Sequence, residues 1–200
     1  MNIHAALHEA CINIKKLAPA NEAKLETQLL LEHVLNVSHA WLIAHADDEI
    51  STQHYETFQA LLKRRIDGEP IAYILGEREF YGLKLKVTPN TLIPRPDTET
   101  LVEAALAKIP QNDHTSSLSL PQKRESNHKE KMDFRLRGND LLRNGFENSD
   151  ALQILDLGTG SGAIALAIAK HRPIAQVTAV DSSKATLDIA IENAQTLEIS

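Results

Sequence analysis

Three glycines at alternate positions follow a short apolar run in the second half of the chain. The apolar run covers 154–157, the glycines are Gly158, Gly160 and Gly162, and small or branched apolar residues fill most of 163–169. This order predicts a strand, a tight turn and the first turns of a buried helix. Backbone N–H groups at a helix start are unpaired, and glycines carry no side chain to cover them, so the turn is a predicted ligand site.

Two carboxylates flank the glycine turn. Asp156 lies two residues before the first glycine, and Asp181 directly follows a second apolar run at 176–180. If both runs are parallel strands of one sheet, their carboxyl ends meet at one edge, where an acid can bond the hydroxyls of a ribose. The turn and the second acid together predict a site for a cofactor that contains a nucleoside.

The spacing fits more than one cofactor. Gly158, Gly160 and Ala163 match the G-x-G-x-x-G/A fingerprint of dinucleotide-binding folds, with an acid about 20 residues further on. Asp156 disfavours a dinucleotide, because a carboxylate about 5 Å from a pyrophosphate is repelled by about 3 kcal/mol at an effective dielectric constant of about 20. S-adenosylmethionine carries a sulfonium and an ammonium group and no phosphate. We therefore predict S-adenosylmethionine, with NAD as the alternative and a purely structural glycine turn as the third interpretation.

The overall composition limits the class of protein. The chain of 200 residues has room for one or two domains, and its net charge of −6 argues against general binding to nucleic acid, which needs positive charge. Cys11 is the only cysteine, so neither a disulfide framework nor a cysteine zinc site is expected. The sequence has no apolar run of about 18 residues and no signal-peptide pattern. We expect a soluble, monomeric protein of the cytoplasm that does not enter a membrane.

The first third of the chain has helical periodicity. Apolar residues recur at helical spacing from 3 to about 75, which predicts a small helical bundle at 1–76. The predicted N-caps of its helices are Asn2, Asn21, Ser38 and Ser51. Histidines are frequent here, but His4 and His8, one helical turn apart, have no third ligand at a convincing spacing. The histidines are therefore interpreted as surface residues, and no metal site is expected.

Alternating periodicity begins after Gly76. A short segment at 78–81, a turn at Gly82, and apolar residues at 83, 85 and 87 that alternate with polar ones at 84, 86 and 88 predict a β-hairpin. The two prolines of 93–96 require extended backbone, and Asp97 is the predicted N-cap of the following helix. A stiff segment that leads into a helix start is either a simple connector or the wall of a ligand pocket.

Residues 111–150 differ in composition from the rest of the chain. Serine, asparagine and charges of both signs dominate, and no periodicity persists. The segment is therefore predicted to be a disordered insert, with a helical fragment near 140–143. Its basic residues could contact RNA, but acidic residues are interspersed among them, which favours a solvated linker.

The order of these elements predicts an α/β protein with three parts. They are a helical domain at 1–76, a hairpin and linker at 77–96, and an α/β domain at 97–200 that the segment 111–150 interrupts. Two parallel strands with their helices do not complete a doubly wound sheet, which has about five or more strands covered on both faces. The last domain is therefore expected to be incomplete.

Three motifs in this order resemble those of a known family. They are Gly-Glu-Arg-Glu-Phe-Tyr-Gly at 76–82, Thr-Leu-Ile-Pro-Arg-Pro-Asp-Thr-Glu at 91–99 and Asp-Leu-Gly-Thr-Gly-Ser-Gly-Ala-Ile-Ala-Leu at 156–166. The family is that of the release factor glutamine methyltransferases, also called PrmC/HemK. The helical front of the chain, which includes Asp-Gly-Glu-Pro-Ile at 67–71, resembles the N-terminal domain of that family. The resemblance covers nearly the whole chain except 111–150.

The resemblance implies a Rossmann-like, class I S-adenosylmethionine-dependent methyltransferase domain, here incomplete, that follows a helical substrate-binding domain. It implies N5-methylation of the glutamine in the Gly-Gly-Gln motif of class I peptide chain release factors, with S-adenosyl-L-methionine as the methyl donor. The cofactor-binding residues that it implies are Asp156, Gly158, Thr159, Gly160, Ser161, Gly162 and Asp181, with Pro94, Arg95, Asp97 and Thr98 as part of the pocket wall.

Two departures from the family pattern affect these expectations. The family has a short connection in place of 111–150, and its Asn-Pro-Pro-Tyr motif, which orients the substrate amide in the family, lies beyond residue 200. No catalytic residue is therefore assigned, and the chain by itself is expected to be inactive. Two alternatives stay open: a methyltransferase that acts on amino groups of nucleic acid, and a truncated fragment that only binds release factors.

Overall fold

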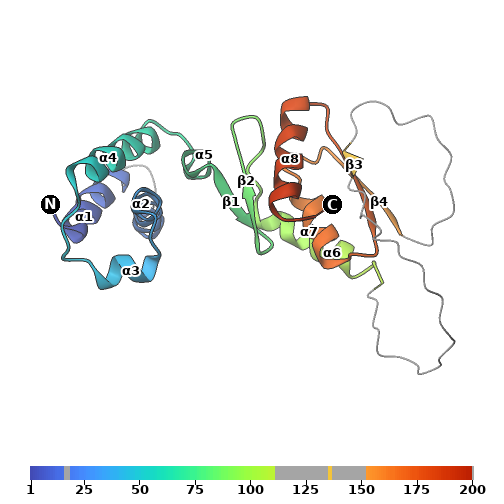
Figure 1. The fold of residues 1–200 in the computed structure, drawn as a ribbon, viewed down its shortest axis with the longest axis horizontal. Coiled ribbons are helices and arrows are strands. Elements are labelled where there is room, and N and C mark those ends of the chain that lie inside the picture. The colour runs from blue at the N-terminus through green and yellow to red at the C-terminus, as the bar shows by residue number, and fades with distance from the viewer. Residues whose placement is uncertain (16–18, 111–134, 137–151, 200) are drawn as a thin grey trace, which may run out of the picture. The chain divides into compact units, whose positions relative to one another are not determined.

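The chain folds into two compact units (Figure 1). Met1–Gly76 is built from helices, and Glu77–Ser200 contains both helices and strands. The structure, a computed structural model, describes residues 1–15, 19–110, 135–136 and 152–199. The finer division of the second unit at residue 96 stays a prediction. No helix in these described stretches is long and apolar enough to cross a lipid bilayer.

The first unit is a bundle of short helices. These helices are α1 (Ile3–Ile14), α2 (Ala20–Leu35), α3 (His39–Ala44), α4 (Thr52–Ile66) and α5 (Ile71–Leu75). Asn2, Ser38 and Ser51 accept hydrogen bonds from the backbone at the starts of α1, α3 and α4, so these three predicted caps are confirmed. The prediction of Asn21 as a cap is wrong. Helix α2 begins at Ala20, two residues earlier than a cap at Asn21 would place it, and follows Pro19, whose fixed backbone angle suits a helix start.

Large apolar side chains from α1, α2 and α4 fill the core of this unit. Those that are at most 1% exposed include Ile14, Leu30, Leu31, Phe58 and Leu62. Helices α2 and α4 are also joined by Arg65, which donates from Nε and Nη2 to the two carboxylate oxygens of Glu26 at 2.8 and 3.1 Å. The helical unit therefore buries its main apolar surface within itself.

The second unit begins with a β-hairpin. Strands β1 (Glu77–Phe80) and β2 (Leu83–Lys86) pair in antiparallel register with Phe80 opposite Leu83. The turn residues Tyr81 and Gly82 both have positive φ, 50° and 73°, as a two-residue hairpin turn of type I′ requires. The apolar side chains of β2 are buried and its lysines are exposed, so the predicted hairpin and its alternation are confirmed.

The segment after the hairpin differs from the prediction at one position. Pro96–Thr98 form a single 3₁₀ turn, and α6 (Glu99–Leu106) begins after it, with Thr98 at the N-cap position. The prediction of Asp97 as the helix cap is therefore wrong. Proline fits the first position of a helical turn, and the turn at 96 places Asp97 inside it instead of before the helix.

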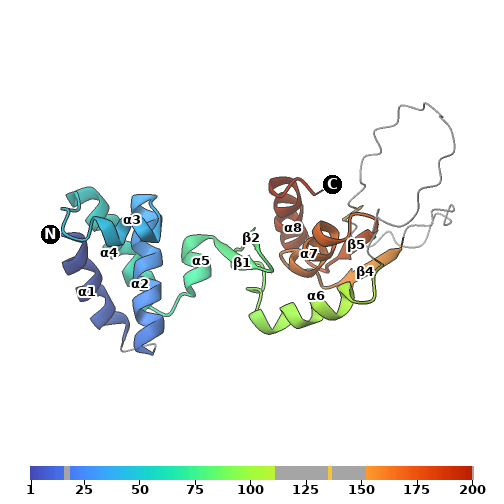
Figure 2. The same cartoon turned by 90° about the horizontal axis from the view of Figure 1, so that it is seen from below.

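A parallel sheet of three strands lies at the centre of the rest of the unit, in the order β3-β5-β4. The strands are β3 (Arg135–Leu136), β4 (Gln153–Leu157) and β5 (Gln176–Val180), and the helices after β4 and β5 are α7 (Ala163–His171) and α8 (Lys184–Thr196). Figures 1 and 2 show α7 and α8 side by side. Within 111–150 only β3 is described, and its backbone pairs with β5. The prediction of disorder is therefore wrong at 135–136, where the chain forms a strand; the rest of the segment, including the predicted helical fragment near 140–143, falls outside the described residues.

The two faces of this sheet differ in burial. Val177 and Ala179 of β5 lie in a core that includes Leu166 of α7. On the opposite face, Leu155 and Leu157 of β4 are 52% and 71% exposed. Alternate residues of a strand point to opposite faces, so the described helices leave the second face of β4 in contact with solvent.

Candidate functional site

The glycine turn connects β4 to α7, as predicted. Gly158, Gly160 and Gly162 have φ values of 75°, 60° and 84°, a region that residues with a side chain rarely adopt. A Cβ on Gly162 would lie 2.9 Å from Cδ1 of Leu166 and 3.3 Å from Cβ of Ala190, whereas a Cβ on Gly158 or Gly160 would meet no atom within 4 Å. The third glycine therefore lets α7 and α8 pack closely, and the first two leave open space beside the backbone.

Most of the backbone N–H groups along the turn donate to the protein itself. The carbonyl oxygen of Val180 accepts from Gly158 N and Thr159 N at 2.8 and 3.0 Å. Gly160 N donates to Oδ2 of Asp181 at 3.0 Å, and Gly162 N donates to the carbonyl of Thr159 at 2.9 Å. The turn is therefore held to the end of β5, and these four donors are already paired.

The two carboxylates are held in place by the same part of the chain. Oδ2 of Asp156 accepts a hydrogen bond from the hydroxyl of Thr159 at 2.7 Å. Asp181 uses Oδ2 for the glycine turn, and its Oδ1 accepts from Ser183 N at 3.0 Å at the start of α8. The structure thus brings Asp156, Thr159 and Asp181 together about one turn, and each carboxylate oxygen keeps a further lone pair for a ligand.

This donor set suits a cationic ligand better than a phosphate. The four donors at Gly158, Thr159, Gly160 and Gly162 are paired within the protein, so these four are not available to a phosphate. The nearby charged groups are carboxylates, which repel a phosphate and attract a sulfonium or ammonium group.

The second predicted part of the site, at 94–98, makes local hydrogen bonds. Thr98 N donates to the carbonyl of Arg95 at 3.0 Å, and the hydroxyl of Thr100 donates to the carbonyl of Asp97 at 2.6 Å. Pro94 is half-buried, and Arg95 and Asp97 are exposed. Among the described hydrogen bonds, none joins these residues to the glycine turn, so their role as a pocket wall stays a prediction.

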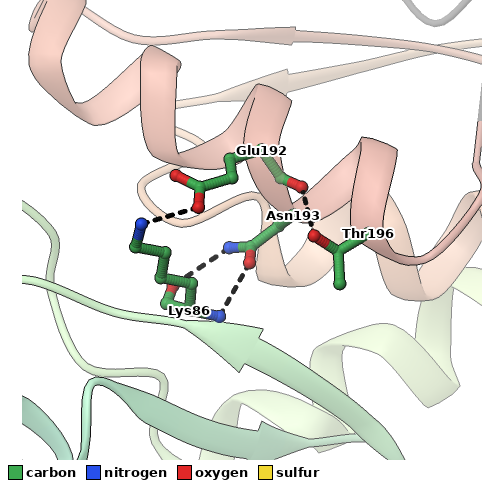
Figure 3. Close-up of polar contacts among 4 residues, drawn as sticks. All are labelled: Lys86, Glu192, Asn193 and Thr196. Atoms are coloured by element: carbon green, nitrogen blue, oxygen red, sulfur yellow. Dashed lines mark hydrogen bonds and ion pairs between the residues drawn. The ribbon is translucent and has the colours of Figure 1, made fainter.

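Sequence reasoning missed Asn193, a buried polar residue that contacts the turn. Its Nδ2 donates to the carbonyl of Ser161 at 2.9 Å, and its side chain also bonds the backbone of Lys86 (Figure 3). One signal was present in the sequence, because Asn193 shares a helical face with Ala190, Ala194 and Leu197, where a polar residue needs a partner.

In the described part of the chain, no three His, Cys, Asp or Glu side chains cluster to hold a metal ion.

Comparison with known proteins links both units to one enzyme class. Residues 6–76 match the family described as PrmC N-terminal domain, and residues 129–200 match the methyltransferase small domain. The second match begins inside the segment 111–150. The two matches thus define the class of the chain by its domains: a helical domain of the PrmC N-terminal kind in front of a methyltransferase small domain.

Curated relatives identify the particular family. The release factor glutamine methyltransferase of Coxiella burnetii is 39% identical over 196 residues, which are 97% of this chain and 57% of the relative. The enzyme of the same name from Escherichia coli K12 is 37% identical over 186 residues, or 93% of this chain and 53% of the relative. The chain belongs to the release factor glutamine methyltransferase family, and it spans about half the length of the curated relatives it matches.

Proposed function

We propose that this chain is the cofactor-binding front part of an enzyme that transfers a methyl group from S-adenosylmethionine to the glutamine of the Gly-Gly-Gln motif in class I release factors. The observation that carries the cofactor assignment is the pair of carboxylates at the glycine turn: Asp156 is bonded to Thr159, and Asp181 is bonded to Gly160 N. A site whose nearby charges are carboxylates favours a cationic cofactor over NAD.

The residues of the turn have separate roles in this proposal. Gly158 and Gly160 leave the space for the cofactor, and Gly162 and Ser161 hold the turn against the helices. Asp181 uses its remaining lone pairs for the hydroxyls of the ribose, and Asp156 supplies negative charge near the sulfonium. The cofactor supplies a methyl group on a positively charged sulfur, which is activated for transfer to a nucleophile.

We further propose that the methyltransferase domain is completed by chain beyond these residues, in a class I, Rossmann-like fold. Parallel sheets are covered on both faces, but Leu155 and Leu157 of β4 are more than half exposed. The match covers 57% and 53% of the two relatives, so 43% and 47% of their length lies outside it. By the family resemblance, the groups that orient the substrate amide lie in that remainder, so residues 1–200 alone bind without transferring the methyl group.

The cofactor assignment predicts the effect of Asp181→Ala. Loss of the carboxylate removes charge-assisted hydrogen bonds and weakens S-adenosylmethionine binding by about 1–3 kcal/mol. Calorimetry is done on a chimera in which the remainder of the Escherichia coli relative follows this chain. Asp188→Ala, which removes an exposed acid of α8, is the matched control and leaves the affinity unchanged. Equal affinity in the Asp181 variant, or tighter binding of NADH than of S-adenosylmethionine, contradicts the assignment.

The acceptor is tested with the same chimera. We expect transfer of a labelled methyl group from S-adenosylmethionine to a release factor, and loss of transfer when the glutamine of the Gly-Gly-Gln motif is replaced by alanine. RNA and DNA are assayed in parallel, and labelling of nucleic acid alone overturns the protein acceptor. Capture of release factor without any methyl transfer would assign the chain a binding role only.

A further inference from the structure

The buried side chain of Asn193 joins two segments that are far apart in the sequence. Asn193 is 2% exposed. Its Oδ1 accepts from Lys86 N at 2.7 Å, and its Nδ2 donates to the carbonyl oxygens of Lys86 at 3.0 Å and of Ser161 at 2.9 Å. One amide group therefore contacts the end of the hairpin and the glycine turn at the same time.

The contact with Lys86 has the pattern of a strand pairing. Lys86 lies opposite Glu77 in the hairpin, but its N–H and C=O point to the other edge of β2, where the amide of Asn193 bonds both (Figure 3). A side-chain amide has the donor and the acceptor that this needs, and aspartate or leucine of similar size lacks one or both. The side chain thus fixes the position of the hairpin edge along α8.

The contact with Ser161 extends this connection to the candidate cofactor site. Ser161 lies between Gly160 and Gly162 and is 1% exposed. The start of α8 is bound to the same regions, because Ser183 N donates to Asp181 and the hydroxyl of Thr186 donates to the carbonyl of Asn90 at 2.8 Å. Helix α8 is therefore hydrogen-bonded both to the cofactor turn and to the segment that leaves the hairpin.

We propose that Asn193 is a positioning residue that holds the glycine turn in register with the hairpin and thereby sets the affinity for the cofactor. The second half of this statement rests on the proposed function, in which the turn binds S-adenosylmethionine. The first half depends only on the three hydrogen bonds. An unpaired carbonyl at Ser161 would be buried, so loss of the amide donors forces the turn to move.

The variant Asn193→Asp tests the proposal because it keeps the shape and the acceptor but loses both Nδ2 donors. Its controls are Glu192→Gln, which removes the exposed ion pair to Lys86 Nζ, and Thr196→Ala, which removes a hydroxyl bonded to the carbonyl of Glu192 (Figure 3). Leu187→Ala, on the same helix and also buried, controls for general loss of stability.

Hydrogen exchange of the 200-residue chain is the first measurement. In Asn193→Asp we expect faster exchange both in β2 and at the N–H groups of 158–162, at a temperature well below unfolding. In the control variants, we expect the exchange rates of β2 and of 158–162 to change no more than those of the rest of the unit. Faster exchange in β2 alone, or an equal increase throughout as in Leu187→Ala, overturns the positioning role.

Calorimetry of the same variants in the chimera is the second measurement. Asn193→Asp weakens S-adenosylmethionine binding by about tenfold to a hundredfold, the range for losing one or two hydrogen bonds. Unchanged affinity, with the parent chimera binding normally, overturns the proposal. If the exchange result is as expected but the parent binds no S-adenosylmethionine, the positioning of the turn is supported and the proposed cofactor is wrong.

Discussion

The two units bury their apolar side chains in different ways. In the helical unit, Phe58, Leu30 and Ile14 are each fully buried, and helices from several directions contribute to one core. In the second unit, the side of the sheet that carries Val177 and Ala179 is packed against helices, but Leu155 and Leu157 on the other side are largely exposed.

The two units therefore differ in how completely their apolar side chains are covered. The first unit has a core of buried side chains contributed from within 1–76, and on its surface Leu25 and Ile43 are 55% and 66% exposed. In the second unit, helices cover one face of the parallel sheet, and the opposite face of β4 is exposed to solvent. Because parallel sheets are covered on both faces in folded proteins, the proposed function places further chain against this open face.

The largest predicted effect is in the closed core of the helical unit. Phe58→Ala removes a fully buried aromatic ring and leaves a cavity, so we expect a loss of about 3–5 kcal/mol in the free energy of unfolding. Urea denaturation followed by circular dichroism measures it, with Thr57→Ala on the exposed side of α4 as the control. A loss below about 1 kcal/mol would mean that the core of this unit is not closed.

The packed face of the second unit is tested by Gly162→Ala. The added Cβ meets Leu166 and Ala190, and the backbone has φ of 84°, so we expect a loss of about 1–3 kcal/mol. Gly82→Ala is the matched control, because Gly82 has φ of 73° but open space around its Cβ position. The difference between the two variants in thermal unfolding isolates the steric part, and no difference would show that α7 and α8 are not closely packed.

Local chemistry explains which parts of the fold the sequence predicts. The caps at Asn2, Ser38 and Ser51 depend on residues a few positions away, and so does the hairpin turn at Gly82. The glycine turn is predictable for the same reason. The choice of helix face is less predictable: Leu101 of α6 is apolar but 56% exposed, because that choice depends on partners elsewhere in the chain.

The parts that the sequence does not predict depend on distant residues. Val180 accepts two hydrogen bonds from the glycine turn more than 20 residues earlier in the chain. Asn193 bonds Lys86 across 107 positions. Local patterns do not specify such pairs, because their geometry arises only when helices and strands are packed, so the glycine turn was predicted and its contact with Asn193 was not.

The open face of the second unit predicts a near-neutral substitution. Leu157→Ala removes a side chain that is 71% exposed, so we expect a change within about 0.5 kcal/mol in the free energy of unfolding of the 200-residue chain. In the chimera, where the remainder of the relative is present, the same substitution is expected to destabilise by about 2–5 kcal/mol, as for a buried leucine. Equal effects in both proteins would show that additional chain does not cover this face.

The smallest predicted effect concerns an exposed ion pair of the closed unit. Arg64 donates from Nε and Nη2 to the carboxylate of Glu69 at 2.7 and 2.6 Å, and these hydrogen bonds lower the pKa of Glu69. A carboxyl group with a lowered folded-state pKa stabilises the fold above its unfolded pKa of about 4.3 and loses that contribution as the pH falls through the folded value. The melting temperature of Glu69→Gln should therefore be below that of the parent at neutral pH and converge with it in acid. Glu56→Gln, an exposed glutamate of α4, is the control. A difference that grows toward acid pH would mean that the Arg64 contact does not favour the charged form, and that the stability of this unit comes from its buried side chains alone.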